Sequence, residues 1–132
     1  MSVAGLPLIE MLKTRMHWHQ ARQKVIAENV ANSDTPNFRP NDMAQPVFDA
    51  RGRADGGSLT VARTNGAHLS LQTARAGLDE REANRFEVRP SGNAVNLEEE
   101  MLRAADNQSD FQLAASLYQK SLQLMRTAIG RR

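Results

Sequence analysis

Apolar residues recur every three or four positions over two long segments, one near each end of the chain. In residues 7–31 the repeat has two polar positions in its middle, His19 and Gln23, and Pro7 stands in the first turn, where a helix tolerates proline. The segment contains no Gly and no second Pro. This spacing predicts a helix about 35 Å long with one face that packs against a partner. The predicted seam on that face consists of Ile9, Leu12, Met16, His19, Gln23, Ile26 and Val30.

The C-terminal segment carries a stronger pattern. Asn96 is a favourable helix N-cap, and Glu99 follows three residues later, as in a capping box. Basic residues lie toward the other end, which suits the helix dipole, and Gly130 is a natural stop. We therefore predict a helix about 50 Å long with a heptad seam and a second apolar flank. The seam consists of Leu97, Met101, Ala104, Gln108, Phe111, Ala115, Tyr118, Leu122, Met125 and Ile129, and the flank of Leu102, Leu113, Leu117 and Leu124.

The middle of the chain, residues 41–94, has a different character. It contains most of the glycines and few large apolar residues. Leu59–Val61 and Leu69–Leu71 alternate with period two around Asn65–Gly66, which favours a small β-hairpin. Residues 73–85 are rich in Ala and charged residues, which favours a weak helix. We expect this middle segment to be poorly ordered by itself.

Together these patterns predict a mainly α fold. Two long terminal helices pair as an antiparallel coiled coil, and a small, weakly ordered middle segment with a potential β-hairpin joins them. The chain then divides into residues 1–40 (the N-terminal helix and a turn motif), 41–94 (a flexible middle) and 95–132 (the C-terminal coiled-coil helix). The C-terminal seam is longer than the N-terminal helix can cover, so we expect other chains to cover the rest.

The end of the first helix is unusually rich in polar residues. Thr35 to Phe38 reads as a tight turn, because Pro36 pre-sets the backbone angle of the second position and Asn37 tolerates the left-handed conformation at the third. Short polar side chains weaken the last turn of a helix, so we favour a role in fixing the turn or meeting a partner over a plain helix stop. The candidate residues of this turn motif are Asn29, Ala31, Asn32, Asp34, Thr35, Pro36, Asn37 and Phe38.

Composition narrows the class of protein. The 132 residues suffice for one domain, and the net charge of +2 comes from basic and acidic residues that are mixed along the chain, without the basic block of a nucleic-acid surface. The absence of Cys excludes disulfides and thiol catalysis. No apolar run is long enough to span a bilayer, and we expect no cleavable secretory signal.

Catalytic and metal-binding patterns are weak. His17 and His19 lie two apart, so on a helix they point to nearly opposite sides and cannot chelate together. Trp18 between them is expected in a core or an interface. The acidic run Glu98–Glu100 is best explained as the charged first turn of a helix. We expect no enzyme activity, cofactor, metal ion, small-molecule substrate or nucleic-acid partner.

The segment Asn29–Phe38, which reads NVANSDTPNF, resembles the signature at the end of the first helix in the flagellar axial protein family, the rod and hook proteins. Val95–Met101, Asn107–Gln108 and Phe86–Pro90 are also similar to that family, and the short chain fits its rod members. One position departs from the family pattern, because Asn37 stands where Gly usually follows the Pro. Asn adopts the same left-handed conformation, so we expect the turn to survive.

The resemblance implies a structural subunit of the bacterial flagellar basal body, whose terminal helices pack as a coiled coil in the proximal rod of the motor axle. It implies export by the flagellar type III apparatus, without a cleavable signal, and assembly in the periplasmic rod. The implied partners are other rod subunits of the FlgC type, the adaptor FliE, the membrane ring, the type III export gate and further copies of the chain.

A second interpretation is a soluble helical-hairpin adaptor or export chaperone that folds as a dimer. It explains the long apolar seam equally well. It gives no reason for the Asn-, Asp- and Thr-Pro-containing turn motif, and we therefore favour the rod subunit.

Overall fold

A computed structural model of the chain is dominated by two long helices, α1 (Pro7–Ala31) and α2 (Leu97–Ala128). Two short strands, β1 (Asn41–Met43) and β2 (Glu80–Glu82), form an antiparallel pair. The predicted mainly α fold with two long terminal helices is confirmed. The structure describes residues 7–49, 52, 80–82 and 88–130.

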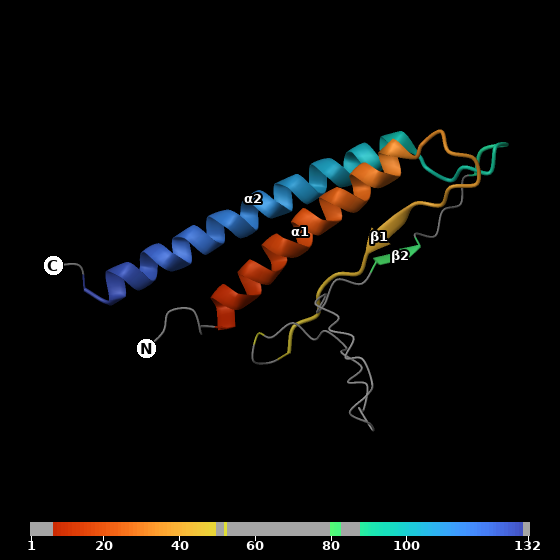
Figure 1. Cartoon of the computed structure of the whole chain (residues 1–132). Coiled ribbons are helices and arrows are strands. Elements are labelled where there is room, and N and C mark those ends of the chain that lie inside the picture. The colour runs from red at the N-terminus through yellow and green to blue at the C-terminus, as the bar shows by residue number, and fades with distance from the viewer. Residues whose placement is uncertain (1–6, 50–51, 53–79, 83–87, 131–132) are drawn as a thin grey trace, which may run out of the picture.

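The two helices lie side by side and run in opposite directions (Figure 1). Asn29 near the end of α1 contacts Glu100 near the start of α2, whereas His19 in the middle of α1 contacts Asn107, two turns further along α2. The predicted antiparallel pairing is therefore confirmed. Figure 1 also shows that α2 continues beyond the start of α1, so its last turns extend past the helix it pairs with.

Local capping sets the ends of α2. The Asn96 side-chain oxygen accepts hydrogen bonds from the backbone N–H groups of Glu98 (3.1 Å) and Glu99 (3.4 Å), which confirms the predicted N-cap. At the other end Gly130 has a positive φ of +79°, the left-handed conformation that ends helices.

The predicted turn follows α1. The N–H of Phe38 donates to the carbonyl of Thr35 at 3.3 Å, and Asn37 at the third position has a φ of +59°. This combination confirms the turn geometry inferred from Pro36 and Asn37.

After the turn the chain runs back along α1, which lies between α2 and β1 (Figure 1). A small core forms there from Trp18, Val25 and Met43. The indole of Trp18 is only 3% exposed, and its Nε1–H donates to the carbonyl of Ala44 at 2.6 Å. Residues just past position 40 are therefore packed against the helix.

The strands differ from the sequence prediction. The hairpin predicted around Asn65–Gly66 lies outside the described residues. Glu80–Glu82 falls in the segment predicted as a weak helix, and that prediction is wrong at these three residues because they pair with β1 as a strand. Hydrogen bonds between β1 and β2 satisfy the backbone groups of these residues. Such a tertiary contact overrides a weak helical preference.

Candidate assembly interface

Asn29 joins three parts of the molecule. Its side chain is 1% exposed and forms two hydrogen bonds with the backbone of Asn41: Nδ2 donates to the carbonyl at 2.7 Å, and Oδ1 accepts from the N–H at 2.9 Å. Nδ2 also donates to Oε2 of Glu100 at 3.2 Å. Because Glu100 is fully buried on α2, Asn29 ties the end of α1 both to β1 and to the start of α2.

Residues 32–41, which we call the elbow, are closed by the segment that precedes α2. Asn93 is 1% exposed, and its Nδ2 donates to the carbonyls of Asn32 (2.9 Å) and Thr35 (2.7 Å). The backbone of the same segment also contacts the elbow, because the N–H of Ala94 donates to the carbonyl of Phe38 at 3.1 Å. The elbow is thus built from both ends of the chain.

The segment that precedes α2 requires glycine at position 92. Gly92 has a φ of +80°, and a Cβ at this position would collide with the side-chain oxygen of Asn37. The two left-handed residues therefore lie directly against each other, and only glycine fits opposite Asn37.

A charged cluster links β1 to both helices. Asp42 accepts from Nε and Nη2 of Arg22 on α1 at 2.9 and 3.1 Å, and from Nη1 of Arg103 on α2 at 3.2 Å. Arg103 also donates to Glu99 at 2.8 Å. The Arg22 guanidinium lies over the Trp18 ring, 5.3 Å from its centroid. Partial burial raises the pKa of Asp42, but the hydrogen bonds and positive charges around its carboxylate outweigh this effect and hold the pKa below its ordinary value.

This cluster predicts a loss of stability in acid. An Asp with a depressed pKa in the folded state contributes stability above its unfolded-state pKa of 3.8, and the contribution disappears as the pH falls through the folded-state pKa. We expect the free energy of unfolding of the wild type to exceed that of Asp42→Asn near neutral pH, and the difference to shrink below about pH 4. Urea unfolding of both proteins across this range measures it. A difference that stays constant with pH would contradict the role of the Asp42 charge.

The interface between the helices is polar at its centre. Asn107 is 2% exposed, and its Oδ1 accepts from Nδ1–H of His19 at 2.7 Å. Its Nδ2 donates to the carbonyl of His19 at 2.8 Å and to Oε1 of Gln23 at 2.9 Å. A shift of one helix along the other separates these buried groups from their partners, so the polar contacts favour the observed register.

The predicted seam residues occupy several environments. On α1 Ile9, Leu12 and Ile26 are buried, Met16 is half-buried and Val30 is exposed. On α2 the buried positions Glu100, Asn107 and Ala114 are seven residues apart, one residue earlier than Met101 and Gln108 of the predicted seam. The half-buried seam residues of α2 are Leu97, Ala104, Phe111, Ala115, Tyr118, Leu122 and Met125, and the exposed ones are Met101, Gln108 and Ile129.

The residues of the turn motif also differ in burial. Asn29 is buried, Asn32 is half-buried, and Nδ2 of Asn32 donates to the carbonyl of Glu28 at 2.8 Å. Phe38 is half-buried where the chain leaves the turn. The exposed members of the motif are Ala31, Asp34, Thr35, Pro36 and Asn37.

Sequence reasoning missed the buried polar residues of α2 and the elbow. Glu98–Glu100 form the acidic first turn of α2 as predicted, but the sequence pattern did not show that Glu100 is buried, where its carboxylate accepts a hydrogen bond from the amide of Asn29. A usable signal existed: Asn93, Glu100 and Asn107 follow a strict seven-residue spacing, and Asn in a helix interior is unfavourable unless its side chain is used.

The flank of α2 formed by Leu102, Leu113, Leu117 and Leu124, which we call the leucine row, is exposed, and two of its members, Leu113 and Leu117, border α1. Its members are 67%, 60%, 45% and 71% exposed. Large apolar side chains gathered on one exposed face mark an interaction surface.

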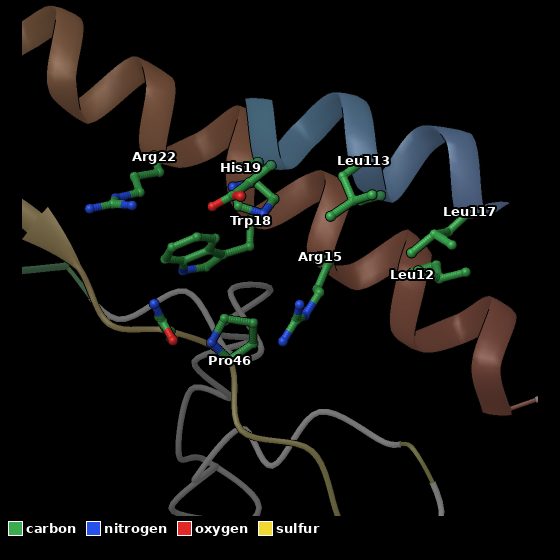
Figure 2. Close-up of a pocket in the computed structure, with 11 residues that line it drawn as sticks. Leu12, Arg15, Trp18, His19, Arg22, Pro46, Leu113 and Leu117 are labelled. Atoms are coloured by element: carbon green, nitrogen blue, oxygen red, sulfur yellow. The ribbon is translucent and has the colours of Figure 1, made fainter. Parts of the chain in front are cut away.

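A groove of about 150 Å³ adjoins this row. Figure 2 shows Leu12 and Trp18 of α1, Leu113 and Leu117 of α2, and Pro46 arranged around it. Arg15, Arg22 and Asp110 also line it, so the groove combines apolar side chains with two basic groups and one acidic group.

These features define a class of protein: an elongated helical subunit with internal polar contacts and an apolar face left open for partners. Within the described part of the chain, neither helix is long and apolar enough to cross a membrane. The same residues contain no cluster of three His or acidic side chains placed to hold a metal ion.

Comparison with known proteins identifies the family. A family model described as flagella basal body rod protein matches residues 10–39. The flagellar basal body rod protein FlgB of Agrobacterium fabrum is 32% identical over 133 residues, which cover 98% of each chain. FlgB of Salmonella typhimurium is 28% identical over 79% of each chain, and FlgB of Bacillus subtilis is 26% identical over 79% of this chain and 78% of its own. The chain belongs to the FlgB family of flagellar basal body rod proteins, which are structural proteins and not enzymes.

Proposed function

We propose that the chain is a subunit of the proximal rod, the part of the flagellar motor axle nearest the membrane, and that its helices pack as coiled coils against those of neighbouring subunits. One observation carries this proposal: the leucine row leaves four large apolar side chains exposed on α2. A rod subunit must present such a face to its neighbours, whereas a free monomer gains nothing from it.

The far end of α2 supports the same proposal. The helix continues beyond the start of α1 (Figure 1), and Ile129 just past its end is 72% exposed. Leu122 and Met125 lie on the same stretch. In the assembled rod a neighbouring helix covers this stretch and extends the coiled coil.

The polar interface suits export in an unfolded form by the type III apparatus before assembly in the periplasm. Buried polar contacts such as His19–Asn107 and Asn29–Glu100 give specificity but less net stability than apolar packing. A helix pair held by them opens more easily than one with a continuous apolar seam.

The elbow then turns the chain out of the helical layer. Its exposed residues, Asp34, Thr35 and Pro36, are open to a neighbouring subunit, whereas Asn29 and Asn93 hold its shape from inside. Under this proposal the neighbours are rod subunits of the FlgC type, the adaptor FliE, further copies of the chain, and the membrane ring and export gate at the rod base.

The test is Leu124→Asp. Leu124 is 71% exposed in the isolated chain, so we expect circular dichroism and the melting temperature to stay unchanged. Incorporation into basal bodies, measured by immunoblotting of the isolated structures, falls at least about tenfold, because an unpaired carboxylate in a closed apolar contact costs more than ~1.4 kcal/mol.

The matched control is Gln123→Asp, which adds the same charge to an exposed neighbour outside the row and leaves incorporation intact. Normal rods and motility in Leu124→Asp would contradict the proposal. So would recovery of the wild-type protein in the cytoplasm and not in basal bodies, which favours the adaptor or export chaperone.

A further inference from the structure

The leucine row has a regular spacing. Leu102, Leu113 and Leu124 are eleven residues apart, which is three turns of an α-helix, so the three side chains project from the same line along α2. Sliding one copy of α2 along another by eleven residues therefore brings leucine against leucine.

Two charges beside the row follow nearly the same spacing. Asp110 at the rim of the groove and Lys120 near the far end of the row are ten residues apart, and both are exposed. Neither forms an ion pair with another described residue. If one copy of α2 is displaced along another by ten to eleven residues, Lys120 of one copy therefore comes close to Asp110 of the other.

We propose that the groove of one copy receives the leucine row of a second, parallel copy displaced along the helix axis by ten to eleven residues, about 16 Å. The displacement places Leu124 of the second copy in the groove beside Leu113 of the first. It places Leu113 of the second copy beside Leu102 of the first, and Lys120 beside Asp110. This inference rests on the proposed function, because it assigns a second copy of the chain as the neighbour that covers the leucine row in the rod.

The groove has the right size and lining for this occupant. Its volume is about 150 Å³, and its walls include the apolar side chains of Leu12, Trp18 and Leu117. A cavity of this volume holds a benzene-sized group, so the groove has room for the four carbons of a leucine side chain. The Lys120–Asp110 pair favours this arrangement of the two copies, because charges at the edge of an interface fix its register.

An antiparallel arrangement satisfies the same charges and has to be separated from the parallel one. It also pairs Asp110 with Lys120, but it sets Leu113 against Leu117 of the second copy. Such a contact is two-fold symmetric, so it closes into a dimer and cannot continue along a rod.

Cysteine cross-linking distinguishes the two arrangements, because the chain has no Cys of its own. Leu113→Cys and Leu124→Cys proteins with tags of different length are produced in one cell, and the isolated basal bodies are oxidised. We expect a disulfide-linked dimer of the two tagged chains, and none when Gln123→Cys replaces Leu124→Cys. A link between Leu113→Cys and Leu117→Cys instead, or no link in either combination, would overturn the parallel contact.

Charge reversal provides an independent test. Asp110→Lys and Lys120→Asp are each expected to lower incorporation several-fold, and the two changes together in one chain restore it. Arg126→Asp, an exposed reversal on another face of α2, leaves incorporation unchanged.

Different results would contradict the self-contact and the rod function. If both single reversals assemble normally while Leu124→Asp still blocks assembly, the self-contact is wrong and the rod function stands. If Leu124→Asp assembles normally too, both the contact and the proposed function are wrong.

Discussion

Asn29→Ala is expected to lower the free energy of unfolding by about 3 kcal/mol, an effect usually seen for large core residues. The substitution removes both hydrogen bonds to the backbone of Asn41 and leaves that peptide group without its side-chain partner. It also deprives the buried carboxylate of Glu100 of the amide of Asn29. Three hydrogen bonds of this buried side chain are lost, and each contributes about 0.5–1.5 kcal/mol, or more where one partner is charged.

Urea unfolding followed by circular dichroism measures this effect. The matched control is Gln20→Ala on the exposed face of the same helix, which changes the free energy of unfolding by less than about 0.5 kcal/mol. Asn29→Asp is a sharper variant, because it keeps the size of the side chain but removes the amide donor and brings a second carboxylate to Glu100. A loss below about 1 kcal/mol in both variants would show that the contacts of Asn29 are not needed for the fold.

Trp18→Ala is expected to cost about 4 kcal/mol, because it empties the centre of the small core between α1 and β1. The indole packs with Val25 and Met43, and its N–H donates to the carbonyl of Ala44. Trp18→Phe keeps most of the ring contact and leaves only that carbonyl without its donor, so about 2 kcal/mol is expected.

The chain has a single Trp, so its fluorescence reports on this core directly. In the wild type we expect the emission to shift to longer wavelength in one step with the loss of helix signal in urea. Leu8→Ala, at a position that is 56% exposed, serves as the control and leaves the midpoint nearly unchanged. A wild-type emission that already matches that of the unfolded chain in buffer would contradict the packing of β1 on α1.

Local features of this fold were predictable, because they depend on residues close together in sequence. Pro7 and the apolar periodicity define α1, Asn96 caps α2, and Gly130 ends it. The turn at Pro36 and Asn37 also follows from the conformational preferences of those residues alone.

Contacts between distant segments were not predictable in the same way. Asn93 reaches carbonyls 58 and 61 residues earlier in the chain, and Asp42 meets Arg103 61 residues later. Nothing in the local pattern around Asn93 or Asp42 shows which backbone or guanidinium group they meet, because that depends on how the helices are placed.

The amino-acid sequence by itself determined two long helices, their ends and the turn after the first, since periodicity, capping and backbone preference act within a few residues. Only the tertiary structure decided which face of α2 meets α1. Leu102 and Met101 are more apolar than Glu100, yet Glu100 is buried because Asn29 supplies a hydrogen bond to its carboxylate. Burial follows the partner that a side chain finds as well as its hydrophobicity, and in this chain it leaves the leucine row exposed.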